Sequence, residues 1–122
     1  MTTTPTRTST RGLDELLAQF VSDLGATMAA GNVVIGDRLG LYCALADAGP
    51  LTSAELATYT ATSERYVREW LRGQAAGAAI SYRDDTDQYW MTPAQALAFA
   101  DPDGPALPGA FQLAVACLAD LP

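Results

Sequence analysis

TSAELATYTATSERYVREWLRGQAAG, residues 52–77, contains two helix-start signals in close succession. Thr52 and Glu55 have the spacing of a capping box, in which each side chain bonds the other residue's backbone N–H. This pattern predicts a short helix that ends near Thr60. A second helix is predicted from about Ser63 to Gly77. Two helices joined by so short a turn are typical of a helix-turn-helix.

The second predicted helix has two faces of different character. Helical spacing gathers the apolar residues and one amide on the side that is expected to pack inward. This side consists of Val67, Trp70, Leu71 and Gln74. The outward side is basic and consists of Arg65, Arg68 and Arg72.

The residues that follow predict a β-hairpin and one more helix. A strand is expected over residues 79–83, a turn over the acidic residues 84–87, and a returning strand over 88–91. Thr92, Pro93 and Gln95 then form a second capping box, with proline where its missing N–H costs nothing. Helices followed by a two-stranded wing predict a mainly α fold, a winged helix-turn-helix.

Upstream, the sequence predicts two further helices. Apolar residues at helical spacing indicate an amphipathic helix over residues 13–28, and Gly31-Asn32 is expected to break or kink it. A second helix is predicted over residues 33–48, with Ile35, Leu39, Tyr42 and Leu45 on one stripe. Gly49-Pro50 is a strong signal for its end.

These patterns divide the chain into three parts. Residues 1–12 are polar and predict a disordered tail, and residues 13–100 form the winged helix-turn-helix domain. Residues 101–122 are a linker followed by an apolar helix, expected over residues 110–121. Because this helix has almost no polar face, it is expected to be buried on most sides.

Four segments resemble the N-terminal winged-helix domain of actinobacterial class I SAM-dependent methyltransferases. The most specific is Arg-Tyr-Val-Arg-Glu-Trp-Leu at residues 65–71. The others are residues 36–42, the Thr-x-x-Glu-Leu-Ala run at 52–57, and residues 74–77. Residues 101–112 resemble that group's connection to its catalytic domain.

The resemblance implies a dimerisation module that helps to close the substrate site. Methyl transfer in such enzymes belongs to a following Rossmann-like domain. That domain is absent from this chain, so a truncated or stand-alone form is expected, with no SAM bound. The residues agree, because the chain has no histidine and no G-x-G-x-x-G pattern. No catalytic, cofactor-binding or metal-binding residue is predicted.

A non-catalytic module of this kind needs an interaction surface. The first and last helices are apolar enough to pair across a two-fold axis or to dock on a separate methyltransferase chain, and pairing with a second copy is favoured. A monomer that folds its last helix onto its own core is the alternative. The predicted dimer interface comprises Leu13, Leu16, Leu17, Phe20, Leu24, Phe111, Leu113 and Leu118.

A winged-helix DNA-binding regulator is the alternative function. Arg65, Arg68 and Arg72 would then contact DNA, since arginine suits guanine and phosphate. Glu64 and Glu69 on the same helix oppose this function, as do the acidic wing tip and the net charge of −7, because DNA affinity comes mainly from neutralising phosphates.

The cysteines and the apolar segments of the sequence point to no further function. The two cysteines, Cys43 and Cys117, lack metal-site spacing and are expected to be small buried residues. No apolar stretch is long enough to span a bilayer and no signal-peptide pattern is present. A cytoplasmic location is therefore expected.

Overall fold

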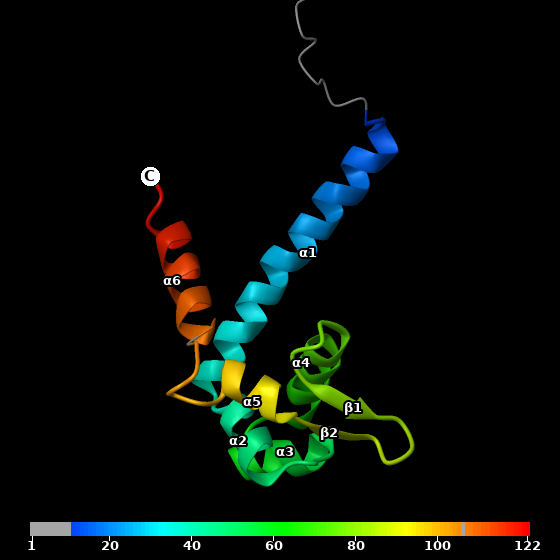
Figure 1. Ribbon diagram of the computed structural model, residues 1–122, viewed down its shortest axis with the longest axis vertical. Helices are drawn as coiled ribbons and strands as arrows, with labels where there is room; N and C mark the ends of the chain where they lie inside the picture. The colour runs from blue at the N-terminus through cyan, green and yellow to red at the C-terminus, as the bar shows by residue number, and fades with distance from the viewer. Residues whose placement is uncertain (1–10, 106) are drawn as a thin grey trace, which may run out of the picture.

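The computed structural model describes residues 11–105 and 107–122, and it confirms the mainly α winged helix-turn-helix (Figure 1). Most of the predicted tail, residues 1–10, lies outside the described residues. In chain order the elements are α1 (Leu13–Arg38), α2 (Leu41–Ala48), α3 (Ser53–Thr60), α4 (Glu64–Ala76), β1 (Ser81–Arg83), β2 (Gln88–Trp90), α5 (Pro93–Phe99) and α6 (Leu107–Ala119).

The core lies between α2, α3, α4 and the hairpin, and Tyr42 stands at its centre. Its ring meets Trp70 edge-on, with centroids 5.0 Å apart, and stacks on Phe99 at the same distance. Both arrangements are ones that aromatic pairs prefer. Its hydroxyl donates to Oε1 of Gln74, so the one amide on the inward face of α4 is satisfied. Burial raises the pKa of Tyr42, and the nearby Asp37 raises it further.

Both predicted capping boxes are present. At the start of α3 the backbone N–H of Glu55 donates to the Thr52 hydroxyl over 3.2 Å, and the Glu55 carboxylate accepts the Thr52 N–H over 3.1 Å. Thr92 and Gln95 repeat the pattern at α5. The Gln95 side chain also accepts from Ser81, over 2.9 Å. It therefore joins α5 to the wing.

The wing is shorter than predicted. Antiparallel pairing is limited to Ser81↔Trp90, Tyr82↔Tyr89 and Arg83↔Gln88. Tyr82 donates a 2.8 Å hydrogen bond to Asp87, which raises the pKa of Tyr82 to about 12. The backbone of Leu51 pairs with that of Tyr89, so β2 is also tied to the turn before α3.

The predicted break at Gly31-Asn32 is wrong. Helix α1 runs through it to Arg38 and ends where Gly40 adopts φ +71°, a conformation that glycine reaches without steric cost. Glycine inside a helix costs only about 1 kcal/mol relative to alanine. Contacts with α4 offset this: Trp70 donates to the Asn32 carbonyl, and Gly36 packs under the indole ring.

The predicted stripe of Ile35, Leu39, Tyr42 and Leu45 is wrong for the same reason. Ile35 and Leu39 lie on α1 and are exposed, whereas Tyr42 and Leu45 lie on α2 and are buried. The turn at Gly40 reorients the chain between the two pairs.

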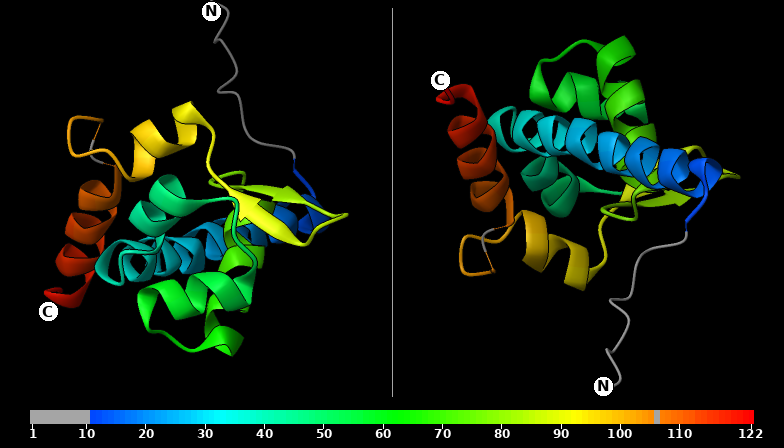
Figure 2. Two further views of the ribbon diagram at one scale, coloured as in Figure 1. Left: turned by 90° about the horizontal axis from the view of Figure 1, so that it is seen from below. Right: turned by 90° about the horizontal axis from the view of Figure 1, so that it is seen from above.

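Helix α6 starts earlier than predicted, because Leu107-Pro108 forms its first turn. Proline fits there since the first N–H groups of a helix have no partner within it. The helix packs on the C-terminal half of α1 and lies at the opposite end of the domain from the wing (Figure 2). The expectation that α6 is buried on most sides is wrong for the described chain, since most of its residues are exposed.

Candidate interaction surface

The N-terminal half of α1 extends away from the rest of the domain (Figure 1). Every residue from 11 to 29 is exposed, and Phe20 and Leu24 expose 62% and 63% of their surface. Such exposure of large apolar side chains in a row is unusual for a soluble monomer. The predicted interface residues on this helix, Leu13, Leu16, Leu17, Phe20 and Leu24, are all exposed.

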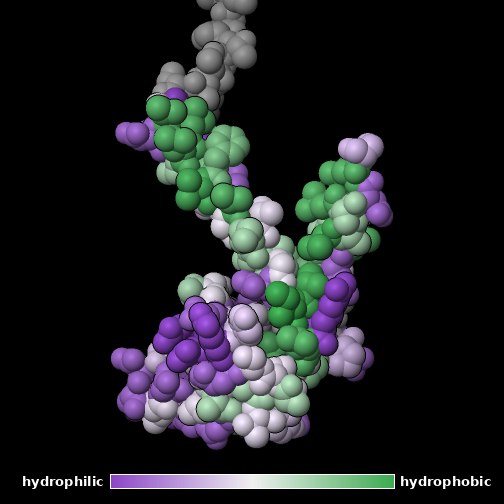
Figure 3. Space-filling model, turned by 180° about the vertical axis from the view of Figure 1, so that it is seen from behind, coloured by the Kyte–Doolittle hydropathy of each residue, from purple (hydrophilic) through white to green (hydrophobic). Residues whose placement is uncertain are grey.

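Helix α6 adds a second apolar surface. Leu113 and Leu118 expose 67% and 60% of their surface, and Figure 3 shows hydrophobic side chains on α6 and on the projecting part of α1. Phe111 differs from the other predicted interface residues, because it is half-buried and packs against the core. Tyr42 and Phe99 are core residues too.

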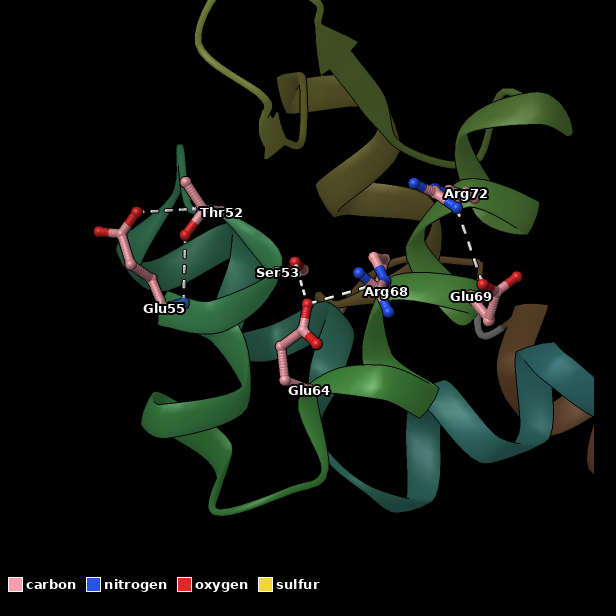
Figure 4. A network of polar contacts seen from close by, with 7 residues as sticks. All are labelled: Thr52, Ser53, Glu55, Glu64, Arg68, Glu69 and Arg72. Carbon is pink, nitrogen blue, oxygen red and sulfur yellow. Dashed lines mark hydrogen bonds and ion pairs between the residues drawn. The ribbon is translucent and has the colours of Figure 1, made fainter.

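Carboxylates accompany two of the three arginines on the outer face of α4 (Figure 4). Arg68 Nε lies 3.8 Å from Glu64, and Arg72 Nη1 lies 3.7 Å from Glu69. Glu64 also accepts a 2.9 Å hydrogen bond from Ser53 at the start of α3. The charge that this helix presents outward is therefore largely balanced.

The wing does not extend the basic surface. Its tip carries Asp84, Asp85 and Asp87, and the only basic residue on its strands, Arg83, lies over the Trp90 ring with its guanidinium 5.3 Å from the ring centre. A wing that contacts the DNA backbone needs cations at its tip. This surface is thus poorly suited to a duplex.

A groove of about 780 Å³ lies between α2, α3 and α5, and sequence patterns gave no signal for it. Its walls include Leu39, Ala44 and Leu97. At its rim Tyr59 donates a 2.8 Å hydrogen bond to Asp47, which raises the pKa of Tyr59.

A second groove, of about 330 Å³, lies between α1 and α4. Its lining is mainly apolar and includes Ile35, Leu39, Tyr66 and Trp70.

The expected burial of the two cysteines is wrong, because both thiols are exposed. Cys43 lies on the face of α2 that borders the larger groove, and Cys117 lies on α6.

Two arrangements that hold SAM or a metal ion in other proteins are not found among the described residues. They contain one antiparallel hairpin and no parallel strands with a glycine-rich turn between strand and helix, the arrangement that holds a nucleoside in a Rossmann-like fold. Within residues 11–105 and 107–122, no three acidic or cysteine side chains converge as a metal site requires.

Comparison with known proteins identifies the family. A family profile described as the Rv2258c-like winged HTH domain matches residues 26–100, more than half of the chain. The chain belongs to this family. This match, together with the solved structures described next, confirms the resemblance to the N-terminal winged-helix domains of methyltransferases. No curated protein matches the chain.

Solved structures similar to this winged HTH domain include methyltransferases. N,N-8-amino-8-demethyl-D-riboflavin dimethyltransferase (RosA) from Streptomyces davawensis is 28% identical, with a TM-score of 0.57, over 77% of this chain and 27% of the enzyme. The S-adenosylmethionine-dependent methyltransferase SibL is 27% identical, with a TM-score of 0.64, over 79% of this chain and 28% of that one. LepI, solved with SAM, shares the fold at 20% identity and a TM-score of 0.66, over 87% of this chain and 25% of its own.

The matched part of this chain thus spans about a quarter of each of these proteins. It is similar to the N-terminal regions of methyltransferases. Among the described residues, no helix is both long and apolar enough to cross a bilayer.

Proposed function

We propose that this chain is the non-catalytic self-association and substrate-lid module of a SAM-dependent methyltransferase. The observation that carries the proposal is the exposed apolar surface of α1. The N-terminal half of α1 projects from the body, and its large apolar residues are exposed in the described chain. A second copy would remove this surface from water, at about 25 cal/mol for each Å² buried.

The similarity to RosA and SibL supports the methyltransferase part of the proposal. DNA binding is not favoured, because carboxylates lie beside Arg68 and Arg72 and the wing tip is acidic.

The self-association test uses light scattering or sedimentation at micromolar concentration, where we expect twice the chain mass. Phe20→Glu places a charge in the apolar surface, so this variant should sediment as a monomer. Ser22→Glu is the matched control: it adds the same charge on the opposite side of α1 and should remain a dimer. A folded wild-type chain that is strictly monomeric would contradict self-association.

The substrate-lid part rests on the larger groove. Its volume of about 780 Å³ and its mixture of apolar walls with a few polar groups are typical of small-molecule sites. Riboflavin serves as a planar aromatic probe, because RosA acts on a riboflavin derivative. We expect it to shift the backbone resonances of Cys43, Tyr59 and Leu97. Shifts elsewhere, or none, would remove the lid role and leave self-association standing.

We also propose that the chain alone binds no SAM, because its described residues do not supply the fold that holds this cofactor. Calorimetry with SAM should give no heat of binding. A measurable affinity would require a site that the described residues do not provide.

A further inference from the structure

The continuation of α1 through Gly31 joins two apolar patterns on one helix face. At 100° per residue, Leu13, Leu17, Phe20, Leu24 and Met28 fall on one stripe, and Ile35 and Leu39 extend it to the C-terminal end. All seven side chains are exposed. We call these seven residues the α1 stripe.

The rest of the domain leaves the five N-terminal residues of the α1 stripe exposed and covers about half of the surface of Ile35 and Leu39. On the C-terminal half of α1, Val33 and Gly36 face the core, where Gly36 contacts Trp70 and Tyr42. Gln112 of α6 donates to Asp37 on another side of the helix. Ile35 and Leu39 line the groove beside α4 and expose 47% and 50% of their surface.

We propose that two copies pair through their α1 stripes in antiparallel orientation, with the two-fold axis passing level with residue 26. This inference rests on the self-association proposed above and specifies its geometry. The pattern is self-complementary about that point. Leu13 comes level with Leu39 of the second copy, Leu17 with Ile35, and Leu24 with Met28. An isologous interface requires this reciprocity.

The antiparallel register also matches large residues to small ones. Between Met28 and Ile35 the stripe lacks a large side chain, and a Cβ placed on Gly31 would meet open space. Val21 of the second copy comes level with Gly31 and Phe20 with Asn32, and these side chains fill the gap. A parallel pair in register would place Phe20 against Phe20 and leave the gap at Gly31 unfilled, which loses packing contacts.

Charges favour the same orientation. Asp14 in the acidic first turn comes level with Arg38 of the second copy, and Arg38 forms no ion pair within the described residues. Its neighbour Glu15 comes level with Asp37, so the attraction is limited to the Asp14–Arg38 pair. A parallel pair would bring the acidic first turns of the two copies together, where like charges repel.

The surface available is large enough for a stable dimer. The seven stripe residues each expose 47–71% of their surface, and with their neighbours they supply much of the ~800 Å² per partner of a standard interface. The groove of about 330 Å³ beside Ile35 and Leu39 adds room for the second copy's N-terminal half. From these observations we infer that the partner that covers the α1 stripe is a second copy of this chain.

The test is chemical cross-linking in a Cys43→Ser/Cys117→Ser background, with a bismaleimide whose reach of about 10 Å matches the spacing of packed helices. In the antiparallel pair, residues 13 of the two copies lie about 39 Å apart, at 1.5 Å per residue. The double variant Leu13→Cys/Leu39→Cys should therefore form a covalent dimer, and either single variant should not. Leu17→Cys/Ile35→Cys should repeat this result.

Circular dichroism first checks that each variant is folded, and light scattering reports its mass. A covalent dimer from Leu13→Cys alone would indicate parallel pairing and overturn the inference. Dimeric mass with no cross-link in either double variant would overturn the register but leave self-association intact. Monomeric mass for every folded variant and for the wild type would overturn both.

Discussion

The indole N–H of Trp70 donates a 2.8 Å hydrogen bond to the backbone carbonyl of Asn32, and so ties α4 to the middle of α1. The contact falls at the position where sequence patterns predicted a break. It gives α1 a tertiary contact immediately after Gly31, where the helix continues.

Trp70→Phe should lower the free energy of unfolding by about 1–3 kcal/mol, because it removes this hydrogen bond and leaves a small cavity beside Tyr42. Urea denaturation at a fixed chain concentration measures the change. Tyr66→Phe on the same helix removes an exposed hydroxyl and should change stability by less than about 0.5 kcal/mol. Equal losses in the two variants would show that the buried contact has no special role.

Gly36→Ala should destabilise the domain by about 1–3 kcal/mol through overpacking. The added Cβ would lie 2.3 Å from Cζ2 of Trp70 and 2.8 Å from Cε2 of Tyr42. Gly25→Ala is the matched control, since its Cβ would meet nothing within 4 Å and should stabilise α1 by about 0.5–1 kcal/mol. Thermal melts distinguish the two, and a shift of the same sign in both would contradict the packing explanation.

The capping box of α3 should make stability depend on pH through Glu55. Hydrogen bonds from Thr52, first the backbone N–H and then the side chain, lower the pKa of this carboxyl. Because folding lowers this pKa, the contribution is complete above the unfolded-state value and is lost as the pH falls through the folded-state value. Gln95 fills the same position at α5 and does not titrate.

Glu55→Gln therefore retains a possible capping partner but removes its titration. Between about pH 7 and about pH 3, which spans the ordinary glutamate range, wild-type stability should fall further than that of Glu55→Gln. Urea denaturation at each pH measures the difference. Identical losses would mean that Glu55 is not favoured as the carboxylate in the folded state.

The domain should not bind duplex DNA, even at about 50 mM salt, where phosphate contacts are strongest. The reason is the balance of charge on α4 and the acidic wing tip. An electrophoretic mobility assay with a short duplex tests this. Salt-sensitive retardation that disappears in Arg65→Ala/Arg68→Ala/Arg72→Ala would instead establish a DNA-binding surface.

The residues determined the local structure wherever a signal acts within a few positions. Thr52 with Glu55 and Thr92 with Gln95 set two helix starts, because each box is closed by its own side chains. The inward face of α4 followed from helical spacing alone. These signals and the predicted hairpin were enough to predict the winged helix-turn-helix. Helical spacing was likewise enough to identify the apolar residues at the start of α1.

Only the tertiary structure decided where α1 ends. Gly31 and Gly40 are both glycines near the end of a helical pattern, and the choice between them depends on Trp70, thirty-eight residues after Asn32. The tertiary structure also packs Phe111 against the core and leaves Cys43 and Cys117 exposed. Burial depends on which distant element covers a helix face, and residue periodicity does not contain that information.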